Sequence, residues 1–300
     1  MRPEITLIKQ SAFHSVGHIY EHIIADKIND FFMVQRYAPL LDYELNANTY
    51  DGIIVISVEA AHETMITGLL SILESVRIDS DDITAAVNQI SSEYERLVQY
   101  DVPELLDEVH ELHTLPWTMR EDFLRSNPIN DDARELNSKL IQFSNTSPHS
   151  FAEFSVTYRV KECPFDLKPL AVYLLQALAL SEINVMVQRI RNCYDSGDEW
   201  AEYQDLVGYS HKFRMLKKDM YSIDELRSIE AGFREVILTS EFSRRLKNYL
   251  TEHAADPIPY FNTKNLYAYS YQVIGHRGWK DIVSDNNIDT ILKKLDVEIW

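Results

Sequence analysis

The first hundred residues show an order of strand, helix, two strands and two helices. Alternating or β-branched runs predict the strands, and apolar positions three or four apart predict the helices. A tight turn at Asp51-Gly52 between two extended runs predicts an antiparallel hairpin. The expected elements are a strand over 4–9, a helix over 16–32, strands over 40–50 and 53–58, and helices over 61–76 and 83–99.

From Ser150 the order of elements begins again, as a weak internal repeat of roughly 145 residues. Residues 101–149 are expected to be connecting segments, interrupted by prolines, around a helix over 132–143. The pattern predicts an α+β protein with two units, residues 1–149 and 150–300. In the second unit the expected elements are a strand over 154–160, a helix over 167–191, a strand pair over 202–215, a helix opening at 222–226 and a last helix near 288–295.

The helix over 16–32 contains His18-Ile19-Tyr20-Glu21-His22. Residues three or four apart lie on one helix face, so the two imidazoles and the carboxylate project to the same side. Catalytic zinc takes three protein ligands and keeps one position for water, and a nearby carboxylate can accept the proton as that water attacks a carbonyl. This order of residues is that of the inverzincin metallopeptidases. The alternative is two surface histidines beside an acid.

The helix over 83–99 offers a candidate third ligand. Ile83, Val87, Ile90, Tyr94 and Leu97 form one narrow apolar stripe. Glu93 lies at the boundary of this stripe, from which a carboxylate can reach a neighbouring helix, whereas Glu95 tends toward solvent. The alternative for Glu93 is an ordinary solvated helix acid.

The composition limits the classes of molecule that this protein is expected to bind. A formal charge of −18 argues against nucleic acid, whose binding depends on Lys and Arg. It favours neutral or basic partners and points weakly to cationic peptides, although solubility alone would explain it. No apolar run is long enough for a membrane span and no signal segment opens the chain, so we expect a cytoplasmic protein. Cys163 and Cys193 are too few for a disulfide framework and are expected to be small core or near-surface residues.

These features together resemble the pitrilysin, insulysin and mitochondrial-processing-peptidase family over about residues 5–97. The resemblance implies a pitrilysin-like fold, in which each unit is an antiparallel-rich sheet with helices packed on one face. It implies that His18, His22 and Glu93 bind zinc and that Glu21 activates water. Family members often carry a further acid before the third ligand, where this chain has Ala86. The segment Asn46, Ala47, Asn48, Thr49 is similar to the family strand along which the substrate peptide pairs in extended form.

The second unit lacks the motif, since aligning 224–226 with 81–83 places Val236 where Glu93 stands. The resemblance therefore implies an inert half, which in the family supplies an Arg and a Tyr that hold the substrate. Arg191 and Tyr203 are the candidates here, the alternative being a surface Arg and a core or rim Tyr. Outside the motif, His110 and His113 are expected on a solvated helix face rather than at a metal.

The hypothesis that follows is a zinc-dependent endopeptidase cleaving extended peptides or small polypeptides. One alternative is a non-catalytic relative that binds a peptide or serves as an accessory subunit of a peptidase complex. Another is a structural α+β protein without metal. Because the chain is shorter than the usual two-domain subunit, we expect a homodimer or a heterodimer with a second family subunit.

Overall fold

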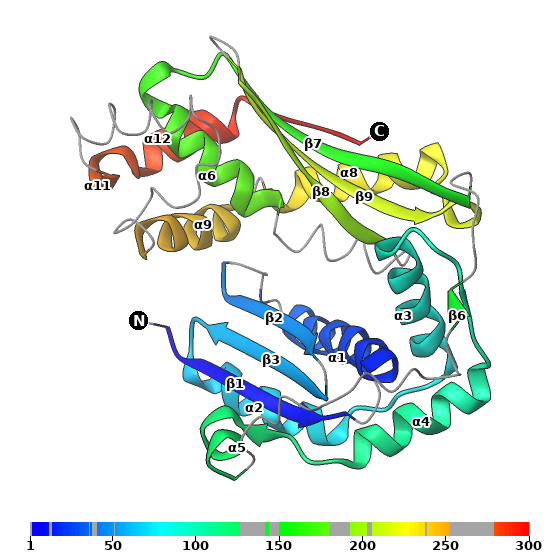
Figure 1. Ribbon diagram of the computed structural model, residues 1–300. Coiled ribbons are helices and arrows are strands. Elements are labelled where there is room, and N and C mark those ends of the chain that lie inside the picture. The colour runs from blue at the N-terminus through cyan, green and yellow to red at the C-terminus, as the bar shows by residue number, and fades with distance from the viewer. Residues whose placement is uncertain are drawn as a thin grey trace. The chain divides into compact units, whose positions relative to one another are not determined.

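A computed structural model describes residues 2–11, 14–35, 37, 41–50, 52–126, 142–143, 150–179, 193–202, 206–237, 239–252 and 279–299. The chain divides into two compact units. The first comprises Met1–Ala152, Arg189–Tyr194 and Met215–Asp219, and the second comprises Glu153–Gln188, Asp195–Arg214 and Met220–Trp300. Each unit combines helices with one four-stranded sheet, so the α+β fold predicted from the sequence is confirmed (Figure 1).

The sheet of the first unit has the strand order β2-β3-β1-β5. β1 and β2 both pair antiparallel with β3, and the hairpin turn uses Gly52 at φ 80°, in the left-handed region that glycine tolerates. The predicted strand and hairpin are therefore confirmed. Among the described strands, β2 lies at one edge of this sheet (Figure 1). The bounds are β1 Glu4–Gln10, β2 Tyr43–Tyr50, β3 Ile53–Ala60 and β5 Thr118–Met119.

Five helices of the first unit are described, and α1 is central because it packs against β2, α3 and α4. Its apolar face, which includes Ile19 and Ile28, is fully buried. A capping box between Asp79 and Asp82 begins α3. The helices are α1 His14–Val34, α2 Glu63–Ser75, α3 Ser80–Glu93, α4 Val102–Thr114 and α5 Arg120–Ser126, and β4 Val98–Gln99 pairs with β6 Gln142–Phe143.

Two sequence predictions in this unit were wrong. The helix expected over 83–99 ends at Glu93, because Glu95 takes φ 54° and reverses the chain, which leaves Tyr94 exposed. The segment expected to be connecting contains α4, whose first turn holds Pro103 and whose N-cap Asp101 accepts a hydrogen bond from the backbone N–H of Glu104. Proline is compatible with the first turn of a helix, and it was misread as a break.

Lys9 is an unexpected buried charge, with 1% of its surface exposed. Its Nζ donates hydrogen bonds to the carbonyls of Leu112 and His113, each at 3.2 Å, and to the carbonyl of Leu115. These carbonyls lie at the C-terminal end of α4, where backbone acceptors lack helical partners and a positive charge is favoured. Burial lowers the pKa of Lys9 to about 8. The residue joins β1 to α4.

In the second unit the strand order is β10-β7-β9-β8. The two sheets share this pattern. In the first unit β1 lies beside β3 and β2 is at the edge, and in the second unit β7 lies beside β9 and β8 is at the edge. The strand pair expected over 202–215 was wrong, because this stretch is mainly β9 and its partner β8 is polar without clear alternation. The bounds are β7 Phe151–Lys161, α6 Lys168–Ala179, β8 Tyr194–Glu202, β9 Leu206–Leu216, α8 Ile223–Ile237, α9 Ser240–Glu252, α11 Trp279–Ile282, α12 Asp285–Leu292 and β10 Leu295–Ile299, with short 3-10 turns at Phe165–Leu167 and Lys217–Asp219.

No helix in the described ranges has the length and apolar character to cross a bilayer. Cys163 and Cys193 are both buried, and neither forms a disulfide in the described part of the chain. The helix expected over 167–191 is described only as far as Ala179, and the one over 132–143 lies almost wholly outside the described residues.

Candidate metal centre

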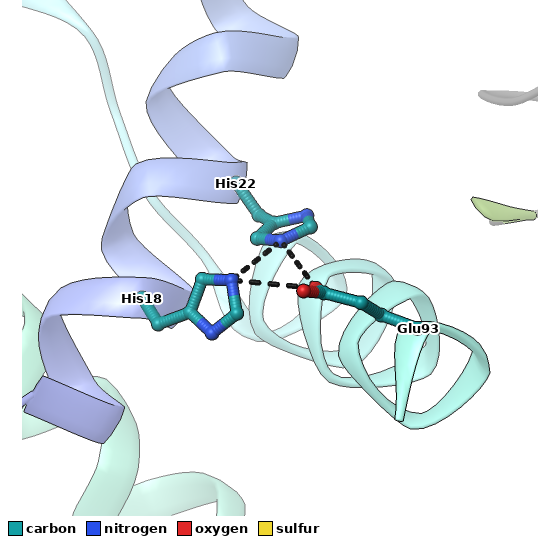
Figure 2. A group of neighbouring side chains, drawn as sticks. All are labelled: His18, His22 and Glu93. Atoms are coloured by element: carbon teal, nitrogen blue, oxygen red, sulfur yellow. Dashed lines mark hydrogen bonds and ion pairs between the residues drawn. The ribbon is translucent and has the colours of Figure 1, made fainter. Parts of the chain in front are cut away.

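Three side chains from two helices of the first unit converge on one point. His18 and His22 project from the same face of α1, and Glu93 reaches them from the last residue of α3 (Figure 2). The two Nε2 atoms are 3.2 Å apart, and Glu93 Oε2 lies 3.4 Å from that of His18 and 3.5 Å from that of His22. Among the described residues, this is the one group of three or more His, Cys, Asp or Glu that could hold a metal ion.

The spacing of these three atoms fits a tetrahedral zinc site. Bonds of about 2.0–2.2 Å to His and carboxylate ligands place ligand atoms roughly 3.3–3.6 Å apart. The observed separations of 3.2, 3.4 and 3.5 Å lie at or next to that range. Glu93 Oε2 is buried and has no hydrogen-bond partner of normal geometry in the described structure. A cation between the three atoms would satisfy this oxygen, so the donor set fits the metal that the sequence predicts.

Gln89 and Asp26 stand behind His22, and the sequence reading missed both. The Nδ1 of His22 is 2.8 Å from Gln89 Oε1, and Gln89 Nε2 donates to Asp26 Oδ2 at 3.1 Å. Gln89 is only 5% exposed. Ala86, seven residues before Glu93 on the same helix, is buried and apolar. A polar residue four positions before Glu93 was the available signal, because that spacing keeps the two side chains on one helix face.

Glu21 lies on α1 between the two histidines and is 8% exposed. Its Oε2 accepts a hydrogen bond of 2.7 Å from the Thr49 hydroxyl on β2. The strand and helix approach closely here, since a Cβ added at Gly17 would lie 2.8 Å from Ser11 Oγ and 3.4 Å from Thr49 Cγ2. The carboxylate is therefore held in one orientation beside the candidate ligands.

The four predicted residues of β2 divide between its two faces. Ala47 and Thr49 are half-buried, whereas Asn46 and Asn48 are exposed. Strand alternation explains this division, because successive side chains point to opposite faces of a sheet. Only Thr49 has a side-chain hydrogen bond to the candidate centre in the described structure.

A cavity of about 270 Å³ lies over the candidate ligands. Besides those ligands and Glu21, its lining includes backbone or side-chain atoms of Ala47, Asn48 and Thr49. His14 and Tyr94 line it as well, and neither was predicted. The ring centroid of His14 is 6.1 Å from that of His18, and the Tyr94 ring stands edge-on to His18 at 6.0 Å. The four-residue spacing from His14 to His18 was the available sequence signal.

The charges of the group act on one another. Burial acts to raise the pKa of Glu93, but the imidazoles of His18 and His22 outweigh it and lower that pKa to about 2. Burial acts to lower the pKa of His22, but Glu93, Glu21 and Gln89 outweigh it and raise that pKa. The carboxylates of Glu21 and Glu93 thus favour positive charge at this position.

The remaining sequence candidates do not join the group. Arg191 and Tyr203 lie outside the described residues. His110 and His113 both lie on α4; His110 is exposed, as expected, whereas His113 is half-buried. His113 Nδ1 is 2.9 Å from the hydroxyl of Tyr20, and His110 Nε2 is 2.9 Å from the carbonyl of Ile78. Both therefore bridge α4 to neighbouring segments of the first unit.

No protein-family model and no curated protein matches the sequence. Several solved structures are similar in fold, and each alignment covers 99% of this chain. They include a protease from Helicobacter pylori (9% identity, 92% of that chain, TM-score 0.33), a putative M16-like peptidase from Alicyclobacillus acidocaldarius (8%, 93%, 0.30) and a peptidase M16 inactive domain from Pseudomonas fluorescens (12%, 91%, 0.27). At such identities and TM-scores, these similarities identify no activity for this chain. An activity can be inferred only from the residues of the candidate metal centre.

Proposed function

We propose that this chain is a zinc-dependent endopeptidase that cleaves extended peptides or small polypeptides. The single observation that carries the proposal is the tetrahedral spacing of His18, His22 and Glu93 around a point next to the buried carboxylate of Glu21. Two imidazoles, a carboxylate ligand and a separate carboxylate base are the set that metal-assisted amide hydrolysis requires.

Each residue of the candidate centre has a separate role in the proposed hydrolysis. Zinc, when held by His18, His22 and Glu93, supplies a Lewis acid that lowers the pKa of a water molecule and polarises the scissile carbonyl. Glu21 accepts a proton from the attacking water and later delivers it to the leaving amine, so no proton is gained or lost overall. The Thr49 hydroxyl holds the carboxylate of Glu21 in place. Burial of Glu21 limits competition from solvent for the same proton.

The edge position of β2 supports binding of an extended peptide. Its pairing with β3 occupies one side, and no other described strand pairs with the opposite side. A substrate backbone can add to such an edge through main-chain hydrogen bonds, with its side chains alternating between the two faces. Asn46, Ala47, Asn48 and Thr49 are the proposed contacts, because the last three line the cavity over the candidate metal centre and Asn46 precedes them on β2. The charge of −18 would favour the approach of basic peptides.

Residues 150–300 are proposed to be an inert second unit, with Arg191 and Tyr203 holding the substrate. For the whole protein we propose a homodimer or a pairing with a second subunit of the same family. These assignments extend the sequence resemblance.

Metal content and peptide hydrolysis, measured on the same preparations, test the proposal. Wild-type protein should bind zinc stoichiometrically and cleave members of a quenched-fluorescence peptide library. Glu21→Gln should keep zinc and lose about 10²- to 10⁴-fold in rate, the contribution of a general base, while His22→Ala should lose both zinc and hydrolysis. Equal cleavage by wild type and Glu21→Gln would overturn the mechanism. Stoichiometric zinc without cleavage of any library peptide would instead indicate a peptide-binding or accessory protein.

A further inference from the structure

Asp26, Gln89 and His22 form a hydrogen-bond chain that can run in one direction only. An ionised Asp26 carboxylate accepts hydrogen bonds and cannot donate. Gln89 must therefore present its N–H group to Asp26, and this contact measures 3.1 Å. The carbonyl end of the same amide then faces His22 Nδ1 at 2.8 Å, so this nitrogen must carry a hydrogen.

We propose that Asp26 and Gln89 are positioning residues that hold His22 in its Nδ1–H tautomer and so leave the Nε2 lone pair for a metal ion. The inference rests on the proposed function for the identity of that ion. A neutral imidazole can carry its proton on either nitrogen, and the partner of one nitrogen decides the form of the other. With the proton on Nε2 instead, His22 would donate toward His18 or Glu93, and its ligand atom would be blocked.

The position and burial of the Gln89 side-chain amide allow it to fix the tautomer of His22. Asp26 lies one turn after His22 on α1, and Gln89 lies one turn before Glu93 on α3. The chain of hydrogen bonds and the candidate ligand group therefore connect the same two helices at consecutive turns. Because Gln89 is 5% exposed, water has little access to compete for either end of its amide. Lys27 and Asp82, with a 2.6 Å ion pair, add a further link between these helices.

The substitution Asp26→Asn tests the direction of the chain. An asparagine at position 26 can either accept from Gln89 Nε2 or donate to Gln89 Oε1, so the Gln89 amide is no longer held in one orientation and can also turn over to donate to His22 Nδ1. We expect the ¹⁵N and ¹H NMR signals of His22, recorded on metal-free protein at alkaline pH, to change from the Nδ1–H pattern alone to a mixture of Nδ1–H and Nε2–H. Zinc affinity, measured by competition with a chromophoric chelator, should fall about 10- to 100-fold.

Two further variants keep the test decisive. Asp26→Ala removes the acceptor without adding a donor and should also weaken zinc binding. Asp30→Asn removes the same charge one turn farther along α1 and should leave the tautomer and zinc affinity within about threefold of wild type. The inference is overturned if His22 keeps Nδ1–H alone in both Asp26→Asn and Asp26→Ala, or if Asp26→Asn and Asp30→Asn weaken zinc equally. Neither readout requires turnover, so a protein that cleaves no peptide refutes the peptidase while this test still decides the role of Asp26.

Discussion

The hydroxyl of Thr49 connects the edge strand β2 to the proposed base Glu21, and removing it isolates that connection. Thr49→Val keeps a β-branched side chain of similar shape but deletes the donor of the 2.7 Å hydrogen bond. Hydrogen bonds to charged groups contribute about 1.5–3 kcal/mol. If the bond orients Glu21 in the transition state, its loss should lower kcat/KM by roughly 10- to 150-fold, at 1.36 kcal/mol for each factor of ten.

The assay compares kcat/KM, zinc content and thermal unfolding for Thr49→Val and Thr6→Val. Thr6 is a matched control, because its hydroxyl forms a 3.0 Å hydrogen bond with Ser57 elsewhere in the same sheet, away from the candidate centre. Both variants should unfold at similar temperatures and both should retain zinc, while only Thr49→Val should lose activity. A Thr49→Val enzyme that retains zinc and has kcat/KM within threefold of the Thr6→Val enzyme would refute the orienting role.

Three further substitutions test the role of Glu93 as a ligand, the close packing at Gly17 and the buried charge of Lys9. Glu93→Gln should weaken zinc binding by at least about tenfold whereas Glu95→Gln should not, as measured by chelator competition; equal effects would contradict the choice of ligand. Gly17→Ala should destabilise the fold by about 1–3 kcal/mol in denaturant unfolding, although alanine favours helix, because its Cβ would lie 2.8 Å from Ser11 Oγ; a more stable variant would show that the clash relaxes freely. For Lys9, the folded pKa of about 8 lies below the unfolded value of about 10.4, so between these values only the unfolded chain keeps the proton. The unfolding free energy of wild type relative to Lys9→Met should therefore rise with pH above 8, and a flat or falling difference measured by urea unfolding would contradict this.

Helix periodicity was enough to place His18, Glu21 and His22 on one face, because their spacing fixes their direction once α1 forms. The same reasoning placed Glu93 at the core boundary, where its side chain is 25% exposed. The end of α3 could not be predicted, since a left-handed residue there is usually glycine and this chain uses Glu95.

The partners of the candidate residues were harder to predict than the residues themselves. The spacing of Gln89 from Glu93 places both on one helix face, but the importance of Gln89 comes from a hydrogen bond to a residue on another helix. Lys9 ends the strand predicted over 4–9, and it is buried because α4 brings its terminal carbonyls to that position. Such contacts depend on which helices pack together, and periodicity within one segment does not contain that information.

The candidate ligands come from α1 and α3, which are far apart in the sequence, so a bound ion would act as a cross-link between two helices. By mass action, a ligand present at a hundred times its dissociation constant adds about 2.7 kcal/mol to the state that binds it. That gain would stabilise the two helices that supply the ligands. Amide hydrogen exchange in α1 and α3 should therefore slow when the ion is supplied and quicken on chelation, while the strands β7 and β9 keep their own rates.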